Sequence, residues 1–201
     1  PLLNTELTEP LRTEIKWLGE MLGGPRDAEV LRERLLQAVR GLPSDAVVGP
    51  VAQRITTELT ARHAATHAAL VDALDSARYR RLADALVQLA ANPPFLKYAH
   101  ARAKGLLQER LAQVGRKTLK EWDRAERASG LEQLHGWHET RKRAKATRYA
   151  WEAARPALGE QAEVAALAWE EVTDSLGVVQ DATVARERLK ELAESAANAG
   201  E

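Results

Sequence analysis

The sequence predicts an all-α fold made of antiparallel helical bundles. Only 4% of its 201 residues are aromatic, and the chain is rich in alanine, leucine, glutamate and arginine, which favour helices. Apolar residues recur with the helical period of about 3.6, and no β-branched run reaches strand length. Short segments containing glycine and proline separate the periodic stretches, as is typical of helices joined by short connections. We therefore expect almost no sheet.

Glycine and proline residues divide the first half of the chain. Gly23-Gly24-Pro25 predicts the end of a first helix, and Gly41-Leu42-Pro43-Ser44 predicts the end of a second. A long helix is then expected from about Asp45 to Leu74. Ser76 follows it and is placed to cap the next helix, because a serine hydroxyl can accept a hydrogen bond from a free amide of the first turn.

The second half of the chain predicts four further helices. A long one is expected from about 92 to 127, beginning at an Asn-Pro-Pro segment, and the next from about 130 to 155. This second helix contains His138 and is followed by Gly159, which favours a helix end. Two more helices, separated near Gly177, bring the expected total to eight.

Composition excludes several classes of protein. The chain has no cysteine, which rules out disulfides, thiolate nucleophiles and cysteine-ligated zinc and is consistent with a reducing compartment. No apolar stretch approaches the roughly 20 residues that span a bilayer, and no signal-peptide pattern opens the sequence. We therefore expect a cytoplasmic protein with no membrane partner.

Charge is unevenly distributed although the net charge is zero. Residues 102–148 carry 13 Lys or Arg and 6 Asp or Glu, whereas residues 149–201 carry 4 and 11. The isoelectric point is therefore a poor guide to partners, and the local field is the relevant quantity. The basic and acidic segments could also neutralise each other by packing together.

An internal repeat predicts a body with pseudo-twofold symmetry. Residues 22–35 align with residues 176–189 at a constant offset of 154 positions, and each copy opens with Leu-Gly and has an aspartate four residues after the glycine. We expect a single domain over 1–201, with a first-repeat part at about 1–75 and a middle and second-repeat part at about 76–201. The same offset places the counterpart of His138 before residue 1.

The helix that contains His138 carries a stripe of cations on one face. At about 100° per residue, six side chains fall within roughly 120° of one another. This set, called the histidine-helix stripe below, consists of His138, Arg141, Lys142, Lys145, Arg148 and Tyr149. Like charges four residues apart repel each other on a bare helix, so a stripe of this kind predicts a polyanionic ligand. The opposite face, with Ala144, Thr147 and Ala154 among its residues, is expected to pack in a core.

The combination of these motifs resembles the CHAD family, the conserved-histidine α-helical domain. The resemblance rests on the histidine-helix stripe, the Leu176-Gly177 and Asp181 segment, and Leu22-Gly23 with Arg26-Asp27. The segment from Ser76 to Arg81 before an apolar stripe is also similar. The resemblance implies a two-bundle helical fold that binds inorganic polyphosphate along a basic surface and is not itself an enzyme. It also implies that the chain begins just after the family's first histidine helix.

Polyphosphate binding requires many Arg and Lys contacts, because a linear inorganic anion offers phosphate oxygens and little else. Beyond the histidine-helix stripe, we expect further cations from neighbouring helices. These are Arg110, Arg116, Lys117, Lys120, Arg78 and Arg81. No catalytic residue, cofactor or metal ligand is expected, since the sequence has no glycine-rich phosphate loop and no metal-binding pair of carboxylates.

Several alternatives remain open at this stage. A basic groove also suits a nucleic-acid backbone, although Tyr149 alone offers a stacking platform in the stripe. The stripe could instead contact an acidic protein, or Arg148 and Lys142 could pair with acids such as Asp27 or Asp181. His63 and His67 have the four-residue spacing of a metal pair but no nearby carboxylate motif. The five tryptophans are best explained as packing residues.

Overall fold

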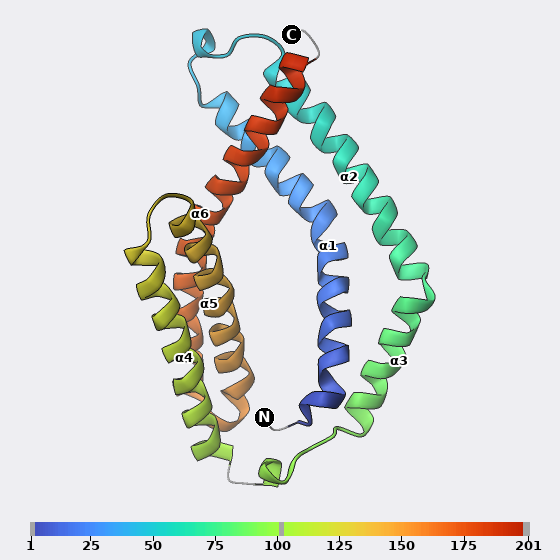
Figure 1. Cartoon of the computed structure of the whole chain (residues 1–201), viewed down its shortest axis with the longest axis vertical. Coiled ribbons are helices and arrows are strands. Elements are labelled where there is room, and N and C mark those ends of the chain that lie inside the picture. Colours follow the sequence, from blue (N-terminus) through green and yellow to red (C-terminus); the bar gives the residue numbers. More distant parts are fainter. Residues whose placement is uncertain (1–2, 101–102, 199–201) are drawn as a thin grey trace. The chain divides into compact units, whose positions relative to one another are not determined.

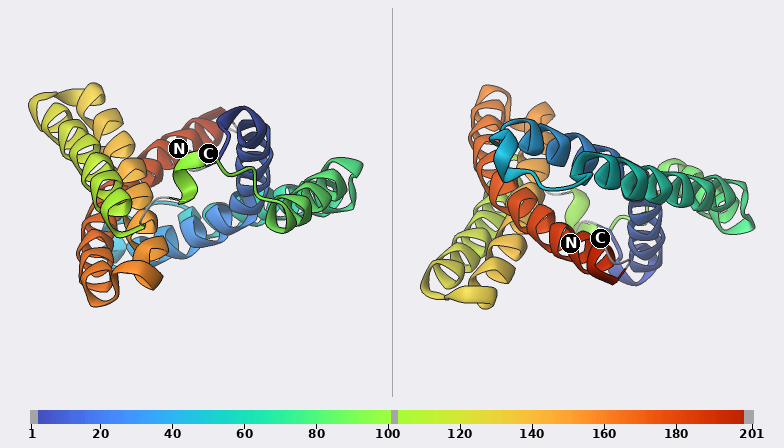
Figure 2. Two further views of the ribbon diagram at one scale, coloured as in Figure 1. Left: turned by 90° about the horizontal axis from the view of Figure 1, so that it is seen from below. Right: turned by 90° about the horizontal axis from the view of Figure 1, so that it is seen from above.

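The computed structural model describes residues 3–100 and 103–198, and these residues form six α-helices (Figures 1 and 2). The helices are α1 Thr5–Arg40, α2 Val51–Asp75, α3 Ala77–Ala91, α4 Ala103–Arg127, α5 Gly130–Leu158 and α6 Glu160–Asn198. Two short 3-10 turns, Ser44–Ala46 and Lys97–His100, lie in the connections. Within the described ranges the one β-type pairing is an isolated bridge between Leu3 and Phe95. The prediction of an all-α fold is confirmed.

The chain forms two compact units. The first comprises Pro1–Ala99 with Lys190–Glu201, and the second comprises His100–Leu189. Helix α6 therefore contributes most of its length to the second unit and its last residues to the first. The predicted boundary near residue 75 concerns the repeats, and it differs from the boundary between these units.

In the first unit α1 packs along α2, and α3 also contacts α1 (Figure 1). Their facing side chains are small or aliphatic, and Leu35, Ile55, Leu59 and Leu82 are each at most 3% exposed. Ser76 caps α3 as predicted, because its hydroxyl accepts a hydrogen bond from the Tyr79 amide at 3.1 Å.

The expected break at Gly23-Gly24-Pro25 is wrong, because α1 continues through it. The glycines and the proline at this place are explained by packing between helices and not by a helix end. Pro25 is buried, and a Cβ added to Gly24 would lie 3.1 Å from Cβ of Thr66 on α2. Glycine is thus used here for a close approach of two helices. Contacts with α2 outweigh the loss of one backbone hydrogen bond at proline.

The expected break near Gly177 is also wrong, since α6 is a single helix. Two helices begin later than predicted: α2 starts at Val51, after Pro50, and α4 starts at Ala103, after Pro93-Pro94 and a 3-10 turn. For α2 the proline gives a reason, because Pro50 disfavours helical backbone at the residue before it, so the helix begins only after the proline.

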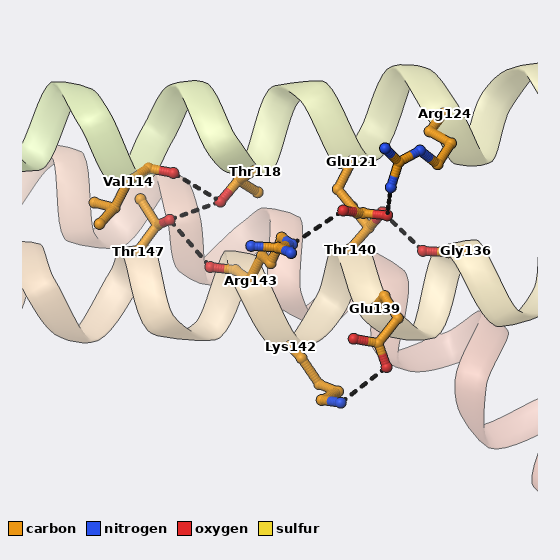
Figure 3. Close-up of polar contacts among 10 residues, drawn as sticks. All are labelled: Val114, Thr118, Glu121, Arg124, Gly136, Glu139, Thr140, Lys142, Arg143 and Thr147. Carbon is orange, nitrogen blue, oxygen red and sulfur yellow. Dashed lines mark hydrogen bonds and ion pairs between the residues drawn. The ribbon is translucent and has the colours of Figure 1, made fainter. Parts of the chain in front are cut away.

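Within the second unit, α4 and α5 lie side by side and run antiparallel (Figure 2). Most of the buried residues between them are small. Their buried positions recur at seven-residue intervals, at Leu111, Thr118 and Ala125 on α4 and at Thr140, Thr147 and Ala154 on α5. The hydroxyls of Thr118 and Thr147 are 2.8 Å apart and form a hydrogen bond, which Figure 3 draws. The predicted core face of α5 is therefore confirmed.

Larger side chains close the ends of this helix pair. At one end Leu111, Ala154 and Ala162 of α6 form a buried cluster, with Trp151 packed against it. Farther along, Trp122 and Trp137 meet edge to face with ring centroids 5.0 Å apart. Three of the five tryptophans thus pack between helices, as predicted.

No helix in the described ranges has a window long and apolar enough to cross a membrane. The cytoplasmic location stays a prediction.

Candidate functional site

The histidine-helix stripe lies on α5, on the side that faces away from α4. Buried Thr140, Ala144 and Thr147 define the face towards α4. Counting 100° per residue from Thr147 places Lys145 and His138 about 160–180° away from that face. Figure 3 shows Lys142 on the side of α5 remote from α4. The face of α5 that the sequence predicted for the stripe therefore does not pack against α4.

Three residues of this side of α5 contact polar residues of α6. Nδ1 of His138 lies 2.8 Å from Oε1 of Gln180. Arg148 pairs with Glu170 at 3.0 Å, and Arg155, which lies on α5 beyond the end of the stripe, pairs with Glu163 at 2.8 Å. Long polar side chains thus connect α5 to α6 along this side, in addition to the small residues Ala154 and Ala162 that pack together at one end.

Arg141 lies between these polar contacts and faces Gly177 of α6. A Cβ added to Gly177 would lie 3.3 Å from Nη2 of Arg141 and 3.5 Å from its Nε. The Nε of Arg141 is buried and has no hydrogen-bond partner among the described residues. A buried guanidinium nitrogen without a partner is unfavourable, because the group has lost water and gained nothing in exchange. Arg141 therefore has donor capacity that an anion could use.

Lys142 and Lys145 differ in their surroundings. Lys142 is exposed, and its Nζ lies 2.8 Å from Oε1 of Glu139 one turn earlier (Figure 3). This hydrogen bond lowers the pKa of Glu139, and burial opposes the shift only in part. Lys145 is half-buried and makes no ion pair within the described part of the chain. It is the lysine of the stripe that is not already neutralised.

Arg148 is held by several groups at once. It pairs with Glu170, its Nε is 3.5 Å from Oε1 of Glu152, and its guanidinium carbon lies 4.9 Å from the Tyr149 ring centre. Burial lowers its pKa, but Tyr149 and the two acids raise it by more, so the net shift is upward. Arg148 is thus a fixed cation in an ion-pair network. Tyr149 itself is 51% exposed.

The cations expected from α4 are exposed but do not all join the stripe. Arg116 and Lys120 lie two residues either side of buried Thr118, which places them on the side of α4 away from α5. Lys117 lies on a flank of α4, as does Arg110, which donates to Gln113 at 3.0 Å. The structure therefore does not bring Arg116 and Lys120 to the face of α5 that carries the stripe.

Arg78 and Arg81 belong to the first unit. The guanidinium of Arg78 donates two hydrogen bonds to Glu14, at 2.6 and 3.1 Å, and lies 4.0 Å from the ring centre of Trp17. These hydrogen bonds lower the pKa of Glu14. Arg78 is thus engaged with α1, whereas Arg81 is exposed beside it.

Partners on α6 were not singled out from the sequence as parts of the site. Gln180, Glu170 and Gly177 contact His138, Arg148 and Arg141, respectively. These contacts follow one regular pattern: in each pair the two residue numbers add up to the same value, as expected for two antiparallel helices in one register. Pairing α5 with α6 in this register would have identified the three α6 residues from the sequence. Within the described part of the chain, Arg148 and Lys142 do not pair with the suggested aspartates: Arg148 pairs with Glu170 of α6, and Lys142 pairs with Glu139 of its own helix.

The described residues contain no group of three side chains suited to holding a metal ion. The rings of His63 and His67 stack with centroids 5.9 Å apart and lack a third ligand there.

Comparison with known proteins identifies the family. A model of the CHAD domain matches residues 1–190. The chain belongs to the CHAD domain family. The resemblance inferred from the stripe and the Leu-Gly repeats is therefore confirmed, and the match extends over parts of both compact units.

The chain is also similar to curated proteins and to a solved structure. The CHAD domain described here is 29% identical over 189 residues to the uncharacterized protein Rv2226 of Mycobacterium tuberculosis strain ATCC 25618 / H37Rv, and equally to MT2285 of strain CDC 1551 / Oshkosh. The alignment covers 94% of this chain and 36% of either relative, so the chain spans about a third of their length. Among solved structures, PptA from Streptomyces chartreusis has a similar fold. The two structures superpose with a TM-score of 0.78 at 23% sequence identity, and the superposition covers 96% of this chain and 69% of the PptA chain.

Proposed function

We propose that this CHAD domain binds inorganic polyphosphate through the α6-facing side of α5 and acts as a non-catalytic binding module. The observation that carries the proposal is the state of Arg141, a half-buried guanidinium that makes no hydrogen bond or ion pair among the described residues. The Nε of Arg148 is also buried without a hydrogen-bond partner, but the guanidinium of Arg148 is paired with Glu170. Lys145, four residues after Arg141 along the same side, makes no ion pair within the described residues either. Two adjacent cations without a carboxylate partner suit an external anion.

The chemistry of the ligand follows from these donors. Arginine presents a planar fork that can contact two phosphate oxygens, and lysine supplies a compact charge. His138 and Lys145 are seven residues apart, which is about 10 Å along a helix and enough for several successive phosphates. A chain with a charge on every repeating unit gains from each such contact, whereas an isolated phosphate gains from only one or two.

Other residues of the stripe have supporting roles in this proposal. Gln180 orients the His138 ring, because a proton on Nδ1 donates to Gln180 and leaves Nε2 for another partner. Lys142 and the hydroxyl of Tyr149, a residue that is about half exposed, can reach a bound chain from the solvent side. Arg148, which is paired with Glu170, adds to the positive field with less direct contact.

The absence of catalysis is part of the same proposal. The Gly23-Gly24-Pro25 segment, which contains adjacent glycines, lies inside helix α1. A phosphate-binding loop needs backbone amides that point at the ligand, whereas those inside a helix are already hydrogen-bonded. The sequence offers no alternative phosphate loop.

Fluorescence anisotropy of labelled polyphosphate tests the proposal. We expect the double variant Arg141→Ala/Lys145→Ala to bind at least about tenfold more weakly, since each hydrogen bond to a charged group contributes about 1.5–3 kcal/mol. The matched control is Arg116→Ala/Lys120→Ala, which removes the same charge from the far side of α4 and should change binding only a few-fold.

Competition separates polyphosphate from the other polyanions. Single-stranded DNA and an acidic peptide, at equal concentration of negative charge, should displace the labelled chain poorly. Equal losses in the two double variants, or displacement by DNA as effective as that by unlabelled polyphosphate, would contradict the proposal.

A further inference from the structure

Arginine and glutamate residues connect α5 to α6 at regular intervals. Arg155 pairs with Glu163 at 2.8 Å, and Arg148, seven residues earlier on α5, pairs with Glu170, seven residues later on α6. The two helices are antiparallel, so the next step of this series joins Arg141 to residue 177. The chain has glycine at that position, and the series of ion pairs stops there.

Backbone conformation does not explain the glycine. Gly177 lies inside the continuous helix α6 and does not have a positive φ. Glycine in a helix interior is destabilising relative to alanine, so another requirement is expected. The guanidinium of Arg141 supplies one, because an added Cβ would lie 3.3 Å from its Nη2. Any side chain at 177 would therefore touch Arg141.

We infer that Gly177 is a positioning residue, which keeps Arg141 out of the interhelical ion pairs and so leaves its guanidinium for a phosphate of the ligand. This inference rests on the proposed function. A carboxylate at 177 would occupy the fork of Arg141 as Glu170 occupies that of Arg148. A phosphate would then have to displace it, and binding would weaken although no ligand-contacting residue had changed.

The test is a set of single substitutions in the same chain. Gly177→Glu places a carboxylate opposite Arg141, and Val178→Glu adds the same charge at the next residue, which is 67% exposed. We expect Gly177→Glu to weaken polyphosphate binding at least about tenfold and Val178→Glu about twofold, as judged by anisotropy. Gly177→Ala adds only a methyl group against the end of a flexible side chain, so it should weaken binding less than threefold.

A double variant shows whether the effect passes through Arg141. Arg141→Gln should weaken binding strongly in the unmodified chain and by less than twofold in the Gly177→Glu background, because the guanidinium is already occupied there. Thermal unfolding of each variant checks the fold, and Gly177→Glu should unfold no earlier than Val178→Glu.

The outcomes separate the two proposals. If the unmodified chain does not bind polyphosphate, the proposed function fails. If the chain binds but Gly177→Glu weakens binding no more than Val178→Glu or Gly177→Ala does, the role of Gly177 is overturned and the proposed function stands. The same conclusion follows if the loss in the double variant equals the sum of the losses, in free energy, caused by Gly177→Glu and Arg141→Gln alone.

Discussion

At the scale of single residues, the stripe consists of cations in unequal states. Arg148 and Lys142 are neutralised by glutamates, whereas Arg141 and Lys145 make no ion pair within the described residues. The sequence predicted that these residues share one face and suggested aspartate partners for Arg148 and Lys142, but it did not identify the glutamates that pair with them. The partner of Arg148 depends on α6, whose register against α5 is a tertiary property that helical periodicity alone does not contain.

Glu139 is predicted to restrain binding by holding Lys142. Glu139→Gln removes the carboxylate 2.8 Å from the lysine, so we expect polyphosphate to bind about two- to fivefold more tightly. The control is Glu126→Gln, at an exposed position of α4, which makes the same change of charge away from the stripe. Anisotropy measures both. Equal effects would show that only net charge matters.

The same pair predicts a titration. Lys142 lowers the pKa of Glu139 in the folded chain, so the contribution of this pair to stability is present above the pKa of the unfolded state. It is lost as the pH falls through the folded-state pKa. Carboxyl-detected NMR should show Glu139 titrating below an ordinary glutamate, and Lys142→Gln should return it towards that value. An unchanged titration in the variant would exclude Lys142 as the cause.

At the scale of helices, several glycines have packing roles that were mistaken for helix ends. Gly24 adjoins Thr66, and Gly177 adjoins Arg141, in the middle of helices. Gly159, with a φ of 58°, does end α5 as predicted. Local sequence does not distinguish these cases, because a glycine that makes room for a neighbouring helix looks the same as one that adopts a left-handed conformation.

Replacing Gly136 by alanine is predicted to destabilise the chain, although alanine has the higher helix propensity. A Cβ at this position would lie 2.9 Å from Cβ of Ala125 and 3.0 Å from its Cα, so α4 and α5 would have to separate. Gly136→Ala should therefore lower the free energy of unfolding by about 1–3 kcal/mol in urea denaturation. Gly19→Ala, in a helix with nothing within 4 Å, should instead raise it by about 0.5–1 kcal/mol. A stabilising Gly136→Ala would show that the two helices approach less closely than described.

At the scale of the whole chain, the fold class and family were predictable but the helix count was not. Periodicity indicated the all-α fold. The stripe, taken together with the two Leu-Gly segments and the segment from Ser76 to Arg81, indicated a resemblance to the CHAD family, and the family match over residues 1–190 confirms it. Six helices are described instead of eight, since two expected breaks fall inside α1 and α6. The sequence predicted that the stripe shares one face of α5, but not that Arg116 and Lys120 lie on the side of α4 away from α5, because the face that α4 turns to α5 was not known.

Charge distribution predicts how binding depends on pH. The chain has an isoelectric point near 7.5, so its net charge becomes negative at higher pH. Arginine and lysine keep their charges up to roughly pH 9. Polyphosphate affinity at constant salt should therefore fall less than about threefold between roughly pH 7 and 9 if local cations bind the ligand. Anisotropy at several pH values measures this. A loss that follows net charge would contradict a local site.

A crystal structure of the chain with a short linear polyphosphate tests the central claim most directly. We predict phosphate oxygens within hydrogen-bonding distance of the Arg141 guanidinium and of Nζ of Lys145, with Arg148 still paired to Glu170. Phosphates bound elsewhere, with Arg141 turned to a carboxylate of the protein, would contradict the account.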